Sequence, residues 1–511
     1  MSHRRKFIKD FSIGSAAIAI GIKDPQHIFP LASSGKGPYM ATGIKIGEVS
    51  ATEAIVWVRL TKNKERIDDT APEPVILYKN DATGEFQKRD HGDSRPDLEP
   101  RVEYVNGSDI NSIAGAVPAG EGEMRVLYKT ANEHKWMETS WEKAGLDQDG
   151  IRQFQLSGLL PGKEYAIRVE SRPSGMTNAA NMMEGGFKTA PAKDDHADIR
   201  FMVVTCQAYH DRDYGNKGFK IYESMLKQKP DFFVHTGDII YYDQQAKNLD
   251  LARWHWQRVY SFPTLVEFHK KVSSYFMKDD HDTWMNDCWP DMQTRFMGDF
   301  TFKQGQRLFL EQVPMGGKTY RSYRWGKHLQ IWMVEGRDYR SANDMPDGPE
   351  KTIWGKEQIN WFKQTVEGSD ATYKILISPT PLVGPDRPKK NDNYANQGFY
   401  LEGEMLRRFV EEHDMFVVNG DRHWQYASKD AETGLLEFGC GPVSTEHAGG
   451  WNSNDRKPEH LYLNVIGGYL EVNIKHAGGH PEVIFTFHGV DGKILYEYKH
   501  QASTNVRNDQ Q

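Results

Sequence analysis

Hydrophobic residues follow two different patterns along this 511-residue chain. From residue 40 to about residue 192, short apolar runs are separated by clusters of Gly, Pro, Asn and Asp, which is typical of β-strands joined by turns. After residue 197, apolar runs of strand length alternate with segments of helical length, as in α/β domains. The pattern predicts an N-terminal all-β domain and a larger α/β domain, with the polar segment 189–196 as the linker.

The predicted β domain spans residues 38–192, and no helical run of useful length interrupts it. Its strand-like runs are 54–59, 75–78, 124–128 and 165–169. The turn Leu159-x-Pro161-Gly162 leads into a strand that carries Tyr165, and this resembles the tyrosine corner of a fibronectin type III-like sandwich. Because the segment is longer than such a sandwich, we expect the polar stretch around residues 81–120 to be an insertion.

The predicted α/β domain spans residues 197–503. Its expected strands are 201–205, 232–236, 273–278, 329–334, 373–377, 415–419, 469–474, 483–488 and 494–498. Its expected helices are 218–228, 251–260, 304–312 and 355–366. Trp254, Trp256 and Tyr260 are expected in the core, with a substrate platform as the alternative.

Four of these strands are followed directly by residue types that bind metals. Cys206 follows the first, Gly237-Asp238 the second, the segment 279–282 the third and the segment 420–423 the fourth. Strands that are apolar throughout are buried on both faces, as in a parallel sheet covered by helices, and ligands gather at the carboxyl ends of such strands. A thiol, carboxylates and imidazoles at one edge therefore predict a metal centre.

Each candidate ligand has an alternative interpretation. Asp238 is the expected bridging carboxylate between two cations, and a turn with a cap is the alternative for Gly237-Asp238. Tyr241 as a phenolate would favour a ferric ion, although it could be an ordinary aromatic residue. Cys206 could be a small buried hydrophobic residue. In the segment 279–282 we expect Asp280 as a ligand and His281 as a phosphate-facing group, whereas Asp279 and Asp282 could belong to a solvated acidic loop.

Further polar residues lie close to these motifs. Asn286 and Asp287 are candidate supplementary oxygen ligands. Arg337 follows the strand 329–334, and its guanidinium could bind phosphate oxygens in pairs or form a surface salt bridge. Arg422 is a second candidate phosphate clamp.

Composition excludes several classes of protein. The formal net charge of -7 at pH 7 argues against a nucleic-acid-binding protein. Three cysteines exclude a disulfide scaffold, although Cys288 and Cys440 could pair in an oxidising compartment. No segment after the N-terminus has the roughly 18 continuous apolar residues that a membrane helix needs, so we expect no stable membrane span.

The first 37 residues read as a signal peptide. Arg4 and Arg5 precede a weakly hydrophobic, Gly/Ala/Ser-rich run at 11–22 and a small-residue stretch at 32–34. The paired arginines resemble a bacterial twin-arginine signal, and the alternative is a basic tail. We therefore expect the twin-arginine export machinery as a partner and a periplasmic or secreted location.

The motifs together resemble the PhoD-type alkaline phosphatase family of metallophosphoesterases. Besides Cys206-Gln207 and Gly237-Asp238-Ile239-Ile240-Tyr241, the similar segments are Asp279-Asp280-His281-Asp282, Tyr320-Arg321-Ser322-Tyr323-Arg324-Trp325-Gly326, Glu335-Gly336-Arg337-Asp338-Tyr339-Arg340, Gly355-x-x-Gln358-x-x-Trp361, Gly420-Asp421-Arg422-His423 and Pro442-Val443-Ser444. The chain departs from the family at Lys278-Asp279, where the family has Trp-Asp, and at Glu335, where it has Asp.

The resemblance implies a fibronectin-like β-sandwich followed by a four-layer (α-β-β-α) metallophosphoesterase domain. It also implies one Fe³⁺ with one or two Ca²⁺, and a binuclear Zn²⁺ or Mn²⁺ centre is the alternative. Carried over by position, the iron ligands are Cys206, Asp238, Tyr241 and His423. The calcium ligands are Asp238, Asp280 and Asp421.

The function implied is hydrolysis of small-molecule or polymer phosphate esters. A metal-bound hydroxide would attack phosphorus, His281 could donate a proton to the leaving group, and Arg337 or Arg422 could hold the phosphate. One alternative is a phosphodiesterase that acts on cell-wall or lipid phosphodiesters. Another is a surface-binding protein whose phosphoesterase fold is inert.

The export expectation has a direct test. Replacing both Arg4 and Arg5 with Lys should leave the precursor in the cytoplasm, because the paired arginines are the feature by which such signals are recognised. Fractionation of cells that express a reporter fusion measures this. Normal export of the double-lysine variant would contradict it.

Overall fold

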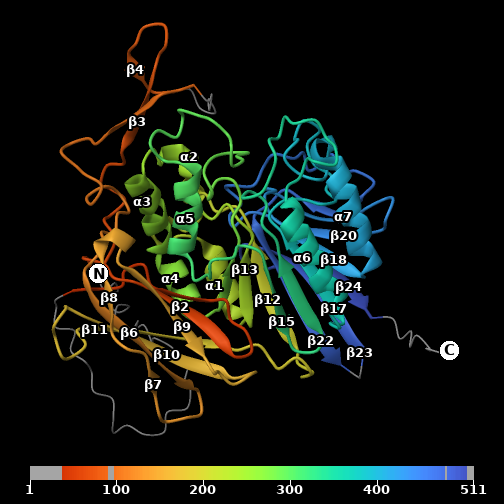
Figure 1. Ribbon diagram of the computed structural model, residues 1–511, viewed down its shortest axis with the longest axis horizontal. Coiled ribbons are helices and arrows are strands. Elements are labelled where there is room, and N and C mark those ends of the chain that lie inside the picture. The colour runs from red at the N-terminus through yellow and green to blue at the C-terminus, as the bar shows by residue number, and fades with distance from the viewer. Residues whose placement is uncertain (1–36, 90–96, 478–479, 503–511) are drawn as a thin grey trace, which may run out of the picture.

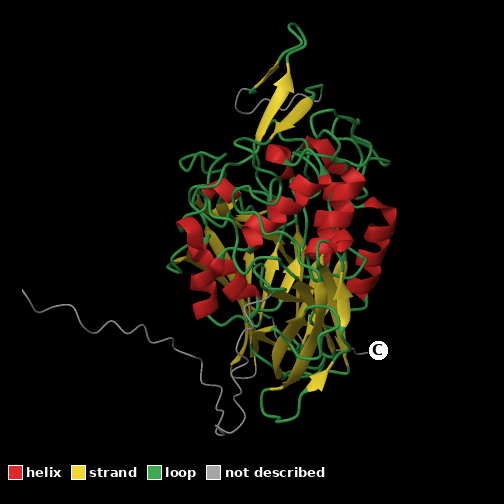
Figure 2. Cartoon of the chain, turned by 90° about the vertical axis from the view of Figure 1, so that its left-hand side faces the viewer, coloured by secondary structure: helices red, strands yellow, loops and turns green. Residues whose placement is uncertain are grey.

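The computed structural model describes residues 37–89, 97–477 and 480–502 (Figure 1). The expected signal peptide, except for Gly37, lies outside the described residues. Two large sheets face each other in the described part of the chain, and helices cover their outer faces (Figures 1 and 2).

The first sheet has nine strands and carries three of the ligand-bearing strand ends. In spatial order they are β24 (Ile494–Gln501), β23 (His480–Gly489), β22 (Gly468–Ala477), β12 (Ile199–Val204), β13 (Phe232–His235), β14 (Ser274–Phe276), β1 (Ile44–Gly47), β2 (Glu53–Arg59) and β9 (Ile151–Ser157). Strands β12, β13 and β14 are parallel, so their carboxyl ends meet at one edge of this sheet.

The second sheet has seven strands and carries the fourth ligand-bearing strand end. Their order is β15 (Arg321–Trp325), β16 (Leu329–Met333), β17 (Tyr373–Ser378), β18 (Met415–Asn419), β20 (Leu436–Cys440), β19 (Gln425–Lys429) and β21 (His460–Asn464). Strands β16, β17, β18 and β20 are parallel. The four ligand-bearing strands therefore belong to two facing sheets, not to one parallel sheet.

Three hydrophobic cores lie between the layers and join them. Between the sheets, Phe201 and Val234 of the first pack with Ile375 and Val418 of the second. A second core joins the outer face of the first sheet to α1 (Lys220–Lys227), α2 (Tyr242–Gln245), α3 (Leu249–Tyr260), α4 (Pro263–His269) and α5 (Phe302–Gln312). A third joins the second sheet to α6 (Gly355–Glu367) and α7 (Tyr400–Glu412). The result is a helix–sheet–sheet–helix arrangement.

The N-terminal β segment forms a further hydrophobic core. Strands β1, β2 and β9 share it with a five-stranded sheet made of β6 (Gly122–Thr130), β7 (Met137–Glu138), β8 (Glu142–Ala144), β10 (Glu164–Arg172) and β11 (Asn181–Lys188). The backbone N–H of Leu160 donates to Tyr165 Oη at 2.8 Å, the hydrogen bond expected of a tyrosine corner. Strand β1 pairs with β14 at Gly47 and Ser274, so this β segment continues the first sheet. Its fibronectin type III-like character and its boundary at residue 192 stay predictions.

The stretch expected to be an insertion lies on the helices instead of on the β segment. It carries most of a three-stranded sheet made of β3 (Val75–Lys79), β4 (Phe86–Gln87) and β5 (Pro100–Glu103), which projects at the top of Figures 1 and 2. Tyr78 stacks on Phe296 with ring centroids 5.4 Å apart, and Trp254 Nε1 donates to Ala114 O at 2.9 Å.

One expectation about aromatic residues is also resolved. Trp254, Trp256 and Tyr260 are almost fully buried, which confirms that they belong to the core. Among the described residues, no helix is long and apolar enough to cross a membrane.

A buried ion pair connects the two sheets near the site. Arg321 of β15 donates through Nε to both carboxylate oxygens of Glu48, which follows β1, at 2.9 and 3.0 Å, and through Nη2 to Phe276 O at 2.7 Å. Tyr323 Oη donates to the same carboxylate at 2.6 Å. The side chains of both Arg321 and Glu48 are only 9% exposed, so their charges depend on each other.

Glu48→Gln should lower the free energy of unfolding by about 3 kcal/mol, because it leaves the Arg321 charge buried without its counter-ion. The exposed pair Arg101–Glu103 provides the control, and Glu103→Gln should cost less than about 1 kcal/mol. Urea unfolding of both variants measures the difference. Equal costs would contradict the coupling between the sheets.

Candidate metal centre

The ligand candidates at three strand ends share an unusual backbone conformation. Cys206 after β12, Asp238 after β13 and Asp421 after β18 have φ values of 50°, 54° and 63°. Non-glycine residues rarely adopt this left-handed region, and where they do, the surrounding structure must hold them there. The same local bend therefore ends all three strands at the edge where the two sheets meet.

Glycine precedes two of these residues because the site leaves no room for a side chain. A Cβ on Gly237 would lie 2.7 Å from the Asp279 backbone nitrogen, and Gly237 itself has a φ of 118°. A Cβ on Gly420 would lie 2.7 Å from Thr205 Oγ1 and closer still to Thr236 Oγ1. The two Gly-Asp motifs thus allow neighbouring strand ends to approach closely.

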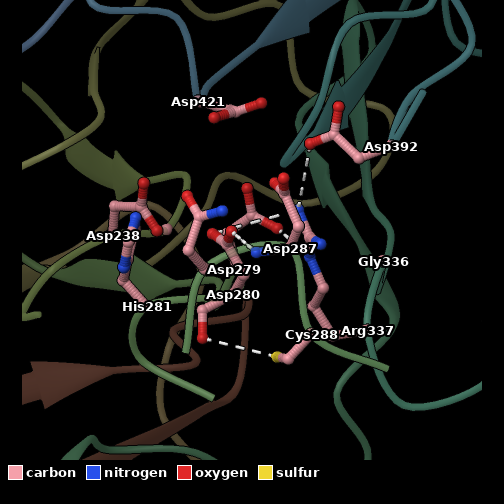
Figure 3. A network of polar contacts seen from close by, with 12 residues as sticks. Asp238, Asp279, Asp280, His281, Asp287, Cys288, Gly336, Arg337, Asp392 and Asp421 are labelled. Carbon is pink, nitrogen blue, oxygen red and sulfur yellow. Dashed lines mark hydrogen bonds and ion pairs between the residues drawn. The ribbon is translucent and has the colours of Figure 1, made fainter. Parts of the chain in front are cut away.

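Three groups of potential ligands overlap at Asp238. In each group the ligand atoms lie within 4.8 Å of one another, and the groups are Cys206–Asp238–His423, Asp238–Asp280–His281 and Asp238–Asp279–Asp421. Figure 3 shows the acidic members with His281 at the strand ends. Because Asp238 belongs to all three groups, it has the position expected of a bridging carboxylate.

The structure changes the interpretation of the acidic segment 279–282. The alternative of a solvated loop is wrong, because Asp279 is 1% exposed and Asp282 is fully buried. Asp282 accepts hydrogen bonds from the backbone N–H groups of Ile239 and Asp279, so it holds the loop in place. Asp279, not Asp280, completes the ligand group that contains Asp421.

The buried carboxylates fit cations. Asp238 Oδ1, Asp279 Oδ2 and Asp280 Oδ1 are buried and have no hydrogen-bond partner. Burial, with the neighbouring Asp280 charge, raises the pKa of Asp238 well above its usual value. An ionised buried carboxylate costs free energy unless a positive charge lies beside it, and a bound cation would remove this cost. The ligand candidates on one side of Asp238 are a thiol, a phenol, an imidazole and carboxylates, and those on the other side are carboxylates. These two sets suit two different metals.

A chain of side chains that the sequence did not indicate supports Tyr241. Its Oη lies 2.7 Å from His447 Nε2, and His447 Nδ1 lies 2.7 Å from Asp211 Oδ2. The rings of His423 and His447 are 4.1 Å apart. Burial, with the charges of Cys206 and Asp238, raises the pKa of Tyr241, so ionisation of the phenol requires a cation. His447 lies in the loop that follows β20, seven residues after the strand ends at Cys440, so the strand-end pattern did not mark it.

His281 is held by Asp243, another residue that the pattern did not mark. Its Nδ1 lies 3.1 Å from Asp243 Oδ1, and its ring lies 4.3 Å from that of Tyr241. Burial opposes a charge on the imidazole, but Asp243, Asp280 and Asp238 together raise the pKa of His281 well above its usual value. The direction of this pKa shift favours the protonated ring, which is the form that can donate a proton.

Arg337 and Arg422 are both buried, so a surface salt bridge is wrong for Arg337. Its Nε donates to Asp279 Oδ1 at 2.5 Å, and its Nη2 forms longer ion pairs with Asp280 at 3.9 Å and Asp392 at 4.0 Å (Figure 3). Among the described residues, neither terminal nitrogen of Arg337 has a hydrogen-bond partner. Arg422 forms ion pairs with Asp421 and with Asp386, the latter at 3.3 Å. Each arginine therefore orients a ligand candidate, and the terminal nitrogens of Arg337 keep hydrogen-bonding capacity.

The remaining candidates near the site have other partners. The Asp287 backbone N–H donates to Asp280 Oδ2 at 2.6 Å, and its carboxylate accepts from Lys390 at 2.7 Å. Asn286 as a ligand stays a prediction. Cys288 and Cys440 are buried free thiols, so the disulfide between them is wrong.

Two facing mixed sheets covered by helices, with an acidic centre at their strand ends, define the metallophosphoesterase class of fold. The chain belongs to the PhoD-like phosphatase family, whose profile matches residues 201–473. It is 22% identical over 391 residues to alkaline phosphatase D of Bacillus subtilis (strain 168), an alignment that covers 63% of this chain and 64% of that protein, less than two thirds of its length.

Solved structures agree with this fold. A structure of PhoD matches with a TM-score of 0.68 and 16% identity over 92% of this chain and 91% of the other. The purple acid phosphatase PPD1 from yellow lupin (Lupinus luteus) seeds matches with a TM-score of 0.58 and 12% identity over 89% and 73%. The resemblance seen in the sequence is thereby confirmed.

Gly420→Ala should abolish most activity and lower the metal content of the purified protein, because the new methyl group forces apart the strand ends that carry Cys206, Asp238 and Asp421. Gly316→Ala is the matched control, since a Cβ there meets nothing within 4 Å. Phosphatase assays and elemental analysis of both variants measure the effect. Normal metal content in Gly420→Ala would contradict it.

Proposed function

We propose that this protein is an exported metal-dependent phosphoesterase that hydrolyses phosphate esters. The observation that carries the proposal is the overlap of three ligand groups at Asp238, whose buried carboxylate oxygen Oδ1 has no partner within the protein. Family membership supports phosphatase chemistry. Export rests on the N-terminal sequence alone.

Two cations would have different ligands in this site. Cys206, Asp238, Tyr241 and His423 would hold Fe³⁺, because anionic sulfur and oxygen ligands stabilise a trivalent ion. Asp238 and Asp421, with Asp279 or Asp280, would hold Ca²⁺, which prefers oxygen ligands. When bound, such cations act as Lewis acids that polarise the phosphoryl group and lower the pKa of water.

The side chains of the protein supply the remaining functions. Protonated His281 would donate its proton to the leaving alkoxide, and Asp243 would keep its ring oriented. Asp279 holds the Arg337 guanidinium by its Nε, and the terminal nitrogens, which make no hydrogen bond to a described residue, would bind phosphate oxygens. His447 would orient the Tyr241 hydroxyl. The presence of Cys206, Tyr241 and His423 argues against an inert phosphoesterase fold.

The proposal is tested with a panel of phosphate monoesters and diesters, assayed with and without a chelator. We expect hydrolysis that a chelator inhibits reversibly, because oxygen-ligated cations exchange readily. Asp238→Asn should reduce the rate by about a thousandfold or more, since the loss of electrostatic stabilisation from even one group costs a factor of 10²–10³. Glu103→Gln, far from the site, is the control. Activity that persists in Asp238→Asn would contradict the proposal, and the panel decides between monoesterase and diesterase.

The metal identities have their own readout. A ferric ion bound to the Tyr241 phenolate should give the protein a visible charge-transfer colour, which Tyr241→Phe should bleach while lowering turnover. Elemental analysis should find iron and calcium. A colourless, fully active protein that contains zinc or manganese and no iron would replace the iron assignment and leave the phosphoesterase proposal intact.

A further inference from the structure

Three histidines from distant parts of the chain meet at the edge of the sheets opposite the candidate metal centre. His196 lies in the segment before β12, His328 immediately precedes β16, and His476 lies near the end of β22. The parallel strands β12 and β16 begin here and end at the candidate centre. Since β12 has six residues, the two places are on the order of 20 Å apart.

The three side chains bring their nitrogens together. Their ligand atoms lie within 4.8 Å of one another. His196 Nδ1 is 2.9 Å from His328 Nε2, and the rings of His328 and His476 stack with centroids 4.9 Å apart. His476 Nδ1 is buried and has no hydrogen-bond partner among the residues that the structure describes. Burying an imidazole nitrogen without a hydrogen bond costs free energy, and a ligand bound in the cluster would remove this cost.

The surroundings orient His328 as a metal ligand. Its Nδ1 lies 2.8 Å from Thr372 Oγ1, so a proton on Nδ1 leaves the lone pair of Nε2 directed at the cluster. Metal-binding histidines are commonly held by such a hydrogen bond from the other ring nitrogen.

We propose that His196, His328 and His476 form a binding site for one Zn²⁺ or a similar divalent transition-metal ion. Imidazole nitrogens suit Zn²⁺, Ni²⁺ or Cu²⁺, whereas Ca²⁺ and Mg²⁺ require oxygen ligands. Three protein ligands leave a fourth position for water. The site is separate from the candidate phosphoesterase centre and does not depend on the proposed function.

The bound ion would link three parts of the fold. His196 belongs to the segment that leads out of the N-terminal β region, His328 to the second sheet and His476 to the first. Lys327 N already donates to Asp195 O at 2.8 Å, so this segment lies against the turn between β15 and β16. An ion bound here would stabilise the junction of the linker and the two sheets, and would not take part in catalysis.

Lys327 opposes this ion and gives the proposal a second test. Its Nζ lies 3.3 Å from His196 Nε2, and its side chain is exposed. For His196 Nδ1 to bind the ion, the imidazole proton must move to Nε2 and the ammonium must turn away into solvent. Removing this charge should therefore strengthen binding, an effect that no merely structural histidine cluster would show.

The experiment is calorimetric titration of ZnCl₂ into the full-length protein in the Asp238→Asn background, which weakens metal binding at the candidate centre. We expect one equivalent of zinc and a rise in the thermal midpoint. Adding His196→Ala or His476→Ala should weaken this affinity by about 10–100-fold or more, because losing a ligand costs at least as much as losing an outer-shell partner. Adding Lys327→Met should strengthen it by about two- to fivefold.

The controls separate a lost site from a damaged fold. His134→Ala replaces an exposed histidine far from the cluster and should leave zinc binding unchanged. His196 is itself exposed, so its replacement leaves the buried packing in place, and circular dichroism without zinc verifies this. Unchanged zinc affinity in both His196→Ala and His476→Ala would overturn the proposal, and so would weaker binding in Lys327→Met.

Discussion

Uncompensated negative charge at the meeting point of two sheets is the constraint on which the site depends. Asp238, Asp279, Asp280 and Asp421 lie at strand ends, with several of their oxygens buried and unpaired. Their repulsion has to be balanced, and within the protein Arg337, Arg422 and His281 provide only part of that balance. Bound cations would complete it, so metal binding and the stability of this edge would be one electrostatic problem.

The two-sheet architecture makes that concentration of charge possible. Apolar strands fill the space between the sheets, and the strand ends can then carry polar groups without disturbing the core. Gly237 and Gly420 bring those ends within contact distance. The buried pair of Glu48 and Arg321 holds β1 against β15, which fixes the relation between the sheets that the site requires. The same architecture gathers the three histidines where the strands begin.

Local patterns were sufficient for many of the elements and for much of the site, although they missed α4 and α7. Strand length, helix spacing and turn residues predicted β12, β13, β18 and most helices within about two residues, because these features act over a few neighbouring positions. The ligand candidates followed from one general rule, that polar residues after parallel strands converge. Cys206, Asp238, Asp280, His281, Asp421 and His423 do lie together.

By itself, the sequence determined the order of many strands and helices, the family and the residue types at the strand ends, because each of these is written in short stretches of chain. Only the tertiary structure decided which of the acidic residues share a ligand group. It also decided that Asp279 is buried, that His447 and Asp243 support the site, and that His196, His328 and His476 meet. These relations depend on how two sheets face each other, a long-range arrangement set by packing of the whole core that no local spacing contains.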